Sequence, residues 1–219
     1  MNVPQLDAAS QVIIYGAGGH ARELRDELIR CGYIVTAFVD DFNYDRTLEG
    51  VDVISFDRAL QNHKTAIWFI AIGAPSARCA IAAKLERNDV ALGTFISNHA
   101  IISPSAIIKQ GAQIFSRSVI SSNVVVGRSS IVNFGCIISH DVDLDDFVTI
   151  SPGVNIAGNV KVFHGAFIGV AASIKNGRND KKILIGREST VGAGACIIRD
   201  VPEKSVVVGI PGRSLESMK

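Results

Sequence analysis

Two short stretches of this 219-residue chain hold residue types that can do chemistry. His140 is followed directly by Asp141, and an imidazole accepts a proton near neutral pH. The dipeptide alone does not define a function, so its meaning depends on the elements around it. The second stretch, YGAGGHA, places Gly16, Gly18 and Ala21 in the pattern G-x-G-x-x-G/A between an expected strand and an expected helix.

The YGAGGHA stretch suits a ligand phosphate. Glycines let the backbone approach closely, and free N–H groups at a helix N-terminus attract an anion. Asp40 and Asp41 end the next expected strand, where an acid accepts hydrogen bonds from a ribose or a base. Only about ninety residues are available, enough for one half of a dinucleotide fold, so a mononucleotide such as a nucleotide sugar fits better. For His20 the alternative is a polar residue at a helix start that touches solvent.

The elements that must position the YGAGGHA stretch alternate between strand and helix over the first ~95 residues. Apolar residues at helical spacing and short apolar runs bounded by turn residues indicate their limits. We expect strands at 11–15, 34–39, 51–55 and 66–72, and helices at 22–30 and 75–87. The fold class predicted for residues 1–95 is a small α/β, Rossmann-like domain with a parallel sheet, in the role of a nucleotide-sugar-binding domain.

From residue 106 the sequence follows a period of six through twelve consecutive blocks, among them SIVNFG, CIISHD and VDLDDF. The third residue of each block is aliphatic: Ile108, Ile114, Ile120, Val126, Val132, Ile138, Leu144, Ile150, Ile156, Val162, Ile168 and Ile174. Neither an amphipathic helix nor a simple alternating strand keeps such a period, whereas a coil of short strands with tight corners does. The pattern resembles the hexapeptide-repeat left-handed parallel β-helix, and we expect this all-β fold for residues 96–219.

The register breaks after Ile174 and resumes at Ile185. The intervening NGRNDKK is polar and rich in turn residues, which predicts a solvated loop (176–182) leaving one corner; a basic loop beside a ligand is the alternative. Near the C-terminus, Pro202, Pro211 and Gly212 predict that the coil ends.

The repeat also places the histidines. His140 and His164 both occupy the fifth position of a block, where side chains point outward at a corner. They lie 24 residues apart, one turn plus one face, so they belong to different edges of the prism and cannot share a site in one subunit. Position alone does not favour either histidine, and a solvated corner residue is the alternative for both.

Composition sets the broad class. The formal charge of +1 argues against a nucleic-acid or anionic-membrane surface. The longest apolar stretch, 66–74, is far shorter than the ~20 residues that span a bilayer, and the N-terminus does not resemble a signal peptide. The cysteines contain no C-x-x-C pair, which predicts reduced thiols, no metal site and a cytoplasmic protein: Cys31, Cys79, Cys136 and Cys196.

The GAGGH turn, the D-D after the second strand and the H-D within a hexapeptide coil together resemble one bacterial family. These are the sialic-acid O-acetyltransferase-like and nucleotide-amino-sugar N-acetyltransferases, including the enzymes of bacillosamine and perosamine synthesis. The resemblance runs from about Val12 to Arg213, and SHDVDLDDFVTISPGVNIAGNVKV is its most characteristic part. It implies a homotrimer in which acetyl-CoA, the co-substrate, lies between neighbouring coils.

The resemblance also implies roles for individual residues. It assigns His140 as general base and Asp141 as the acid that orients its ring. Asn133 matches a polar residue of the same cleft, where it contacts the sugar. Gly158, one coil above His140, would leave room for the pantetheine arm, and Val170 and Ala193 would follow later on the same track. Nucleotide-sugar binding is carried over to a further set: Gly18, Gly19, His20, Asp40, Asp41 and Gly73. For Asn133 and Gly158 the alternative explanation is structural, because Asn and Gly tolerate the tight turns at a corner of the coil.

The expected function is acetyl-CoA-dependent N-acetylation of the 4-amino group of a nucleotide-linked amino-deoxy sugar, in glycan biosynthesis such as that of the lipopolysaccharide O-antigen. A near alternative is O-acetylation of a sialic or related acid. An alternative function of another class is that of an NAD-dependent oxidoreductase, which would bind its cofactor at the GAGGHA turn. The last alternative is a structural protein whose coil only mediates assembly. The sequence departs from some relatives at Thr149, where they have a second histidine.

Overall fold

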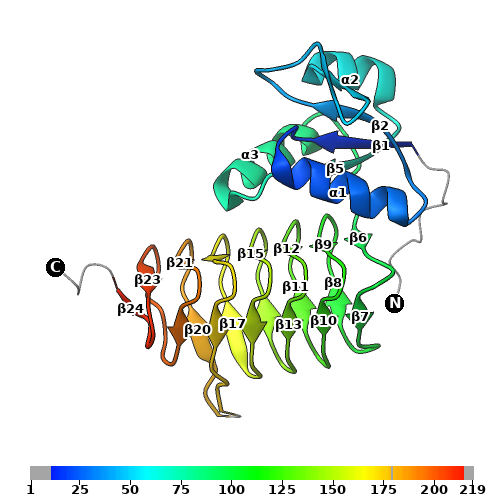
Figure 1. Cartoon of the computed structure of the whole chain (residues 1–219). Coiled ribbons are helices and arrows are strands. Elements are labelled where there is room, and N and C mark those ends of the chain that lie inside the picture. Colours follow the sequence, from blue (N-terminus) through cyan, green and yellow to red (C-terminus); the bar gives the residue numbers. More distant parts are fainter. Residues whose placement is uncertain (1–10, 179, 215–219) are drawn as a thin grey trace.

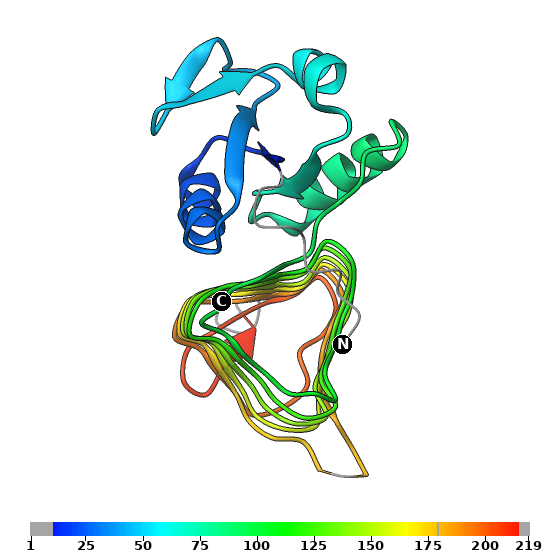
Figure 2. The same ribbon diagram turned by 90° about the vertical axis from the view of Figure 1, so that its right-hand side faces the viewer.

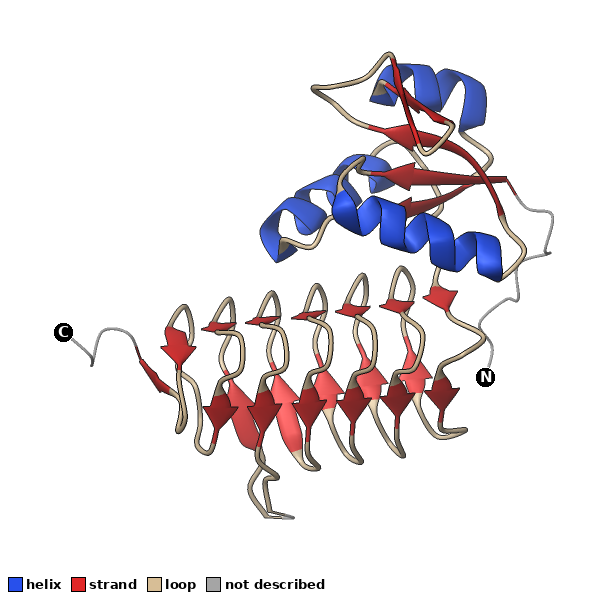
Figure 3. Cartoon of the chain, viewed as in Figure 1, coloured by secondary structure: helices blue, strands red, loops and turns tan. Residues whose placement is uncertain are grey.

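The computed structural model describes residues 11–178 and 180–214. Its first part is a five-stranded sheet with strand order β3-β4-β2-β1-β5, flanked by three helices (Figures 1 and 3). Its elements are β1 (Gln11–Tyr15), α1 (Gly19–Arg30), β2 (Ile34–Val39), β3 (Arg46–Leu48), β4 (Val51–Ile54), α2 (Phe56–His63), β5 (Ile67–Ile70) and α3 (Pro75–Glu86). The predicted α/β class is confirmed. The central β1 is almost entirely buried, as expected of a parallel strand covered on both faces.

Two elements of this sheet domain escaped the sequence analysis. The strand β3 is a short polar segment that pairs antiparallel with β4, so it lacks the apolar run that marks a buried strand. The helix α2 begins after Ser55, whose hydroxyl accepts a hydrogen bond from the Arg58 amide, and only Phe56 and Ala59 of the helix are buried. The capping serine was the available signal for α2.

The second part is a parallel coil with a triangular cross-section (Figure 2). The six-stranded face comprises β7 (Ile101–Ile102), β10 (Val119–Ile120), β13 (Ile137–Ile138), β16 (Asn155–Ile156), β19 (Ser173–Ile174) and β22 (Cys196–Ile197). The five-stranded face comprises β8 (Ile107–Ile108), β11 (Val125–Val126), β14 (Asp143–Leu144), β17 (Val160–Val162) and β20 (Ile183–Ile185). The eight-stranded face comprises β6 (Phe95–Ile96), β9 (Gln113–Ile114), β12 (Ile131–Val132), β15 (Thr149–Ile150), β18 (Phe167–Ile168), β21 (Thr190–Val191), β23 (Val206–Val208) and β24 (Arg213–Ser214).

The predicted hexapeptide frame is confirmed by the packing. Ile120, Ile138 and Ile156 are fully or almost fully buried and stack along the axis, each paired with the residue one coil away. The other aliphatic third positions lie in the same core, except that Ile108 is only partly buried. Small first-position residues such as Cys136 and Ala172 fill the space beside them. The coil therefore owes its stability to a continuous apolar column that no single turn can form alone.

One expectation at the C-terminus was wrong. Pro202 does not end the coil, because Val201 bridges in parallel to Ile185 and β23 pairs in parallel with β21. The chain reverses only after β23, when β24 pairs antiparallel with it. Proline is tolerated here because it occupies a corner and not a ladder position.

The sheet domain rests on the eight-stranded face (Figure 2). The outward side chain of Gln113 is buried there and donates to the carbonyl oxygen of Ile70 at 2.8 Å. Glu27 of α1 accepts hydrogen bonds from the amide and hydroxyl of Ser116. Arg78 of α3 is fully buried in the same junction. The predicted division at 95/96 falls inside β6, which pairs with β9 of the coil.

The four cysteines of the described residues are free thiols: Cys31, Cys79, Cys136 and Cys196. None of the described helices is long and apolar enough to cross a membrane.

Candidate active site

His140 and Asp141 lie at the corner between β13 and β14, which we call the His140 corner. The Nδ1 atom of His140 is 2.8 Å from an Asp141 carboxylate oxygen, and the other carboxylate oxygen accepts from the Asn123 amide at 3.2 Å. Asp141 adopts a left-handed φ of 58°, which an aspartate tolerates. The hydrogen bond with His140, followed by that with Asn123, lowers the pKa of Asp141, so its carboxylate is ionised at neutral pH.

Gly158 supports the ring of His140 from the next coil. A Cβ atom on Gly158 would come 2.4 Å from Cε1 and 2.5 Å from Nε2 of His140. The open space that the sequence assigned to a pantetheine arm is therefore also the space that holds the imidazole. Only glycine at this position lets the ring lie flat against the corner.

His164 lies at a different corner, between β17 and β18, as expected from its spacing. Its ring packs against Phe147 with a centroid separation of 5.6 Å. In contrast to His140, it has a packing role and no adjoining carboxylate in the described part of the chain.

The glycine turn follows β1 at the carboxyl edge of the sheet. Gly18 is the N-cap of α1 and has no side chain with which to cap the helix, so the first N–H groups of Gly19 and His20 have no capping partner there. Gly16 has a φ of +117°, and a Cβ on it would come 2.8 Å from the Ala71 carbonyl oxygen. The turn thus packs directly on the end of β5, beside Gly73.

The two predicted acids already have partners. The Asp40 carboxylate accepts from the amides of Phe42 and Asn43, which fixes its own turn. Asp41 accepts from the Tyr15 hydroxyl at 2.5 Å and from Lys84 Nζ at 3.0 Å. Burial, followed by the hydrogen bond to Asp41, raises the pKa of Tyr15, so the phenol stays protonated.

Lys84 and Arg46 were missed by the sequence analysis. Lys84 lies on α3, and its Nζ is 3.9 Å from the Phe56 ring centroid as well as bonded to Asp41. Arg46 comes from β3, and its guanidinium reaches to 3.5 Å from the Ala17 carbonyl oxygen in the glycine turn. No motif marked either residue, because each is brought to the turn by the pairing of elements distant in the sequence.

His20 stands between the glycine turn and the coil. Its ring packs on Phe115 at 5.3 Å between centroids, and Nδ1 is 3.5 Å from Glu23. Its Nε2 atom is buried without a hydrogen-bond partner in the described residues. Phe115 in turn contacts Phe134 at 4.9 Å, so the coil forms one wall of this region.

The remaining predicted residues occupy another corner. Asn133, Val170 and Ala193 all lie between strands of the eight-stranded and six-stranded faces, which we call the Asn133 corner. Asn133 is 9% exposed and accepts from the Phe134 amide, whereas Val170 is half exposed. Gly158 lies at the His140 corner, so within one chain Val170 and Ala193 are at a different corner from it, and their role in binding the co-substrate stays a prediction.

The structure therefore divides the predicted residues into two groups. The glycine turn, His20 and Gly73 belong to the sheet domain on the eight-stranded face, near the Asn133 corner. His140, Asp141 and Gly158 lie at the corner opposite that face, the one from which the 175–182 loop extends (Figure 2). One chain does not bring these two groups together.

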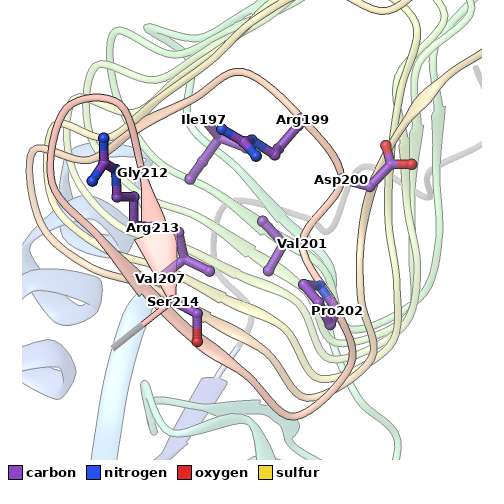
Figure 4. Close-up of a pocket in the computed structure, with 9 residues that line it drawn as sticks. All are labelled: Ile197, Arg199, Asp200, Val201, Pro202, Val207, Gly212, Arg213 and Ser214. Atoms are coloured by element: carbon purple, nitrogen blue, oxygen red, sulfur yellow. The ribbon is translucent and has the colours of Figure 1, made fainter. Parts of the chain in front are cut away.

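Two hollows occur in the described part, and the second adjoins the His140 corner, because its lining residue Lys182 donates to the Asp141 carbonyl oxygen at 2.9 Å. One of about 480 Å³ at the C-terminal end of the coil is lined by residues such as Arg199, Val207 and Arg213 (Figure 4). Another, of about 310 Å³, lies beside the 175–182 loop and includes Lys175, Lys181 and Arg199. Among the described residues, no cluster of three or more potential ligands for a metal ion occurs.

Comparison with known proteins identifies the family. Residues 11–85 match the family described as the PglD N-terminal domain. PerB from Caulobacter crescentus, solved in complex with CoA and GDP-perosamine, is 31% identical, with a TM-score of 0.86 over 93% of this chain and 96% of that one. The chain belongs to the nucleotide-amino-sugar N-acetyltransferase family.

One sequence relative agrees with this family along nearly its full length, and others match only part of the chain. GDP-perosamine N-acetyltransferase from Escherichia coli O157:H7 is 29% identical over 210 residues, which are 93% of this chain and 95% of that protein. Serine acetyltransferase from Bacillus pumilus is 32% identical over 87 residues. That match covers 36% of this chain and 38% of the serine enzyme.

Proposed function

We propose that the protein transfers an acetyl group from acetyl-CoA to the 4-amino group of a nucleotide-linked amino-deoxy sugar. The observation that carries this proposal is the His140–Asp141 pair, 2.8 Å apart and seated on Gly158, in a chain that also holds a glycine turn at a helix N-terminus. PerB, a relative along nearly its full length, was solved with CoA and GDP-perosamine. The likeness supports the same two classes of substrate for this chain.

The proposed reaction uses His140 as general base. The amine attacks the thioester carbonyl carbon, a C–N bond forms, and the C–S bond to CoA breaks. Because Nδ1 is engaged by Asp141, Nε2 is the ring atom that takes the proton shed by the new ammonium group. The proton then passes to the departing thiolate, which leaves as CoA-SH. The ionised Asp141 holds the ring and stabilises the imidazolium that forms between these steps.

The nucleotide portion is proposed to bind at the sheet domain. The unpaired amides at the start of α1 and the nearby Arg46 guanidinium supply positive potential for a diphosphate. The acids Asp40 and Asp41 line the adjoining edge, in the position where such a fold meets a ribose or base. Asn133, at the corner beneath this domain, is proposed to contact the sugar.

The active site is proposed to form between subunits. His140 and the glycine turn lie on opposite sides of one coil, so a complete site needs the His140 corner of a second copy. In this arrangement Gly158 and Val170 face one groove from two different chains. A homotrimer with three such grooves is the assembly we propose.

The activity is tested by incubating the protein with acetyl-CoA and a panel of UDP-, dTDP- and GDP-linked 4-amino sugars. We expect CoA thiol to be released with at least one member of the panel and not with N-acetylneuraminic acid. Absence of release across the panel would remove the proposal, and release with the sialic acid alone would favour O-acetylation.

The shared site is tested by subunit mixing. His140→Ala removes the base, and Gly18→Asp places a carboxylate at the helix start, where an added Cβ atom meets no atom within 4 Å. Each variant alone should be inactive. After co-refolding in equal amounts, sites that draw each group from a different subunit should regain about one quarter of the wild-type activity. Sites contained within one subunit would regain none.

A further inference from the structure

Arg78 is a fully buried cation at the junction between the sheet domain and the coil. Its guanidinium donates to five carbonyl oxygens and one hydroxyl, and in the described chain it has no carboxylate partner. Four of these six acceptors belong to the coil: the carbonyl oxygens of Ser129, Phe147 and Val148 and the hydroxyl of Thr149. Burial lowers the pKa of Arg78 to about 10, so it is still charged at neutral pH.

The other acceptors connect Arg78 to the turn that follows β5. Nη1 donates to the Ile72 and Gly73 carbonyl oxygens at 2.8 and 2.9 Å. Thr149, on the outer side of β15, accepts from Arg78 Nη2 at 2.9 Å and donates its own hydroxyl to Gly73 at 2.8 Å. The Gly73 carbonyl oxygen therefore receives two donors, one from α3 and one from the coil.

The turn has few restraints of its own. Gly73 lacks a side chain, and α3 begins at Pro75 after Ala74 without a side-chain cap. Because the peptide unit is planar and trans, a Gly73 carbonyl held toward the coil forces the Ala74 N–H to point away from it. Ala74 is exposed, and its amide has no partner among the described residues. The two donors thus leave a free N–H at the carboxyl edge of the sheet, beside the glycine turn.

We propose that Arg78 and Thr149 are positioning residues, which hold the Gly73–Ala74 peptide in the orientation that binds the nucleotide sugar. The inference rests on the proposed function and extends it, because Arg78 and Thr149 become part of the nucleotide-sugar site without touching the ligand. Thr149 then helps to form the nucleotide-sugar site of its own chain, at a distance from the His140 corner of that chain.

The test compares Thr149→Val, which keeps the shape and removes the hydroxyl, with Thr149→Ser, which keeps the hydroxyl. Calorimetry with GDP-perosamine should show a dissociation constant raised about three- to tenfold in Thr149→Val and restored in Thr149→Ser, the loss expected for one hydrogen bond. The KM for acetyl-CoA should not change. Arg78→Lys should raise the dissociation constant for GDP-perosamine more than Thr149→Val does, because lysine has fewer N–H donors than arginine. Arg87→Lys, on an exposed residue at the end of the same helix, is the control.

Two results would overturn the proposal: wild-type affinity in both Thr149→Val and Arg78→Lys, or an equal rise in the KM for acetyl-CoA. Circular dichroism confirms that each variant is folded. If the wild-type protein itself does not bind GDP-perosamine, the proposed function fails for that substrate. Hydrogen exchange then tests the positioning role, since Thr149→Val should speed exchange of the Arg78 amide, which donates to the Ala74 carbonyl oxygen, and leave the exchange of β1 unchanged. Equal exchange would reject it.

Discussion

His140 and Asp141 are exposed in the single chain, with 59% and 43% of their side chains accessible to solvent. An exposed side-chain pair of this kind contributes little to stability, so the pair is not explained by folding. Its geometry depends on two neighbouring coils: Asn123 holds the carboxylate from one side and Gly158 supports the ring from the other. The base is therefore oriented by residues one turn above and one turn below it.

Gly158→Ala should disable the base without removing it. The new methyl group would come 2.4 Å from Cε1 of His140, so the ring has to rotate away from its present position. We expect kcat to fall about tenfold to a hundredfold, the effect of a small misplacement of a catalytic group, with the KM for the nucleotide sugar unchanged. Steady-state kinetics with both substrates measures this.

A double-mutant cycle provides the control. In a His140→Ala background, Gly158→Ala should have no further effect on kcat, because the two changes act through the same ring. Additive losses would show that Gly158 acts on the reaction by another route, such as contact with the co-substrate.

Asp141→Asn should lower kcat about tenfold to a hundredfold, less than the 10²–10⁴-fold expected from loss of the base. The asparagine preserves the shape but cannot stabilise an imidazolium. Because the hydrogen bond with His140 holds the pKa of Asp141 below its usual value, the carboxylate is ionised at neutral pH in the wild type. Steady-state kinetics of the variant and the wild type at neutral pH measures this difference. An unchanged kcat in Asp141→Asn would contradict the orienting role.

At the scale of elements, the junction between the sheet domain and the coil consists of polar groups that are almost all satisfied. Glu27 is 1% exposed and binds Ser116 of the coil and Arg30 of its own helix. Burial by itself raises the pKa of Glu27, but the hydrogen bonds from Ser116 and Arg30 outweigh it, and the pKa lies below its ordinary value. The carboxylate thus stabilises the junction in its ionised form.

Glu27→Gln should destabilise the protein by about 1–3 kcal/mol at pH 7, the range for hydrogen bonds to a buried charged group. A carboxylate with a depressed pKa contributes stability above its unfolded pKa of about 4.3, and that contribution is lost as the pH falls through the folded pKa. Urea unfolding at pH 7 and pH 3.5 should show a smaller loss on acidification in the variant than in the wild type. Equal urea midpoints at pH 7 would contradict this account of Glu27.

At the scale of the whole molecule, the six-stranded face lies between the His140 corner and the Asn133 corner. If three copies turn this face toward a common axis, each His140 corner meets the Asn133 corner of its neighbour. The outward residues of the face near its N-terminal end are apolar: Ile101, Val119 and Ile137, of which Ile101 is 67% and Ile137 46% exposed. An exposed apolar stripe of this kind favours an interface.

Ile137→Asp should therefore break the proposed assembly and abolish activity, because it places a charge in the face that we propose meets the neighbouring subunits. Light scattering coupled to size exclusion would show a monomer in place of a trimer. Ile34→Asp, on a similarly exposed isoleucine of the sheet domain (56% exposed), is the matched control and should leave the trimer intact. An unchanged mass for Ile137→Asp would place the interface on another face.

The sequence by itself determined the coil and most of the sheet domain. A period of six is visible in one dimension because every turn repeats the same contact, so the positions of Ile138 and His140 follow from counting. The same counting separated His140 from His164. It did not find β3 or α2, whose short segments become ordered only through pairing and packing with β4 and the sheet. It also did not show that Val170 and Ala193 lie at a different corner from Gly158, because a resemblance says that residues share a ligand but not which subunit supplies them.

Only the tertiary structure decided what lies beside each candidate. Asp41 meets Lys84, the Gly73 carbonyl meets Arg78 and Thr149, and Gly158 meets the His140 ring through contacts between segments far apart in the chain. Such contacts depend on where elements cross in space, and the local pattern of residue types carries no record of them. For the same reason only the structure placed His140 and the glycine turn on opposite sides of one coil, which makes a second subunit part of the proposed site.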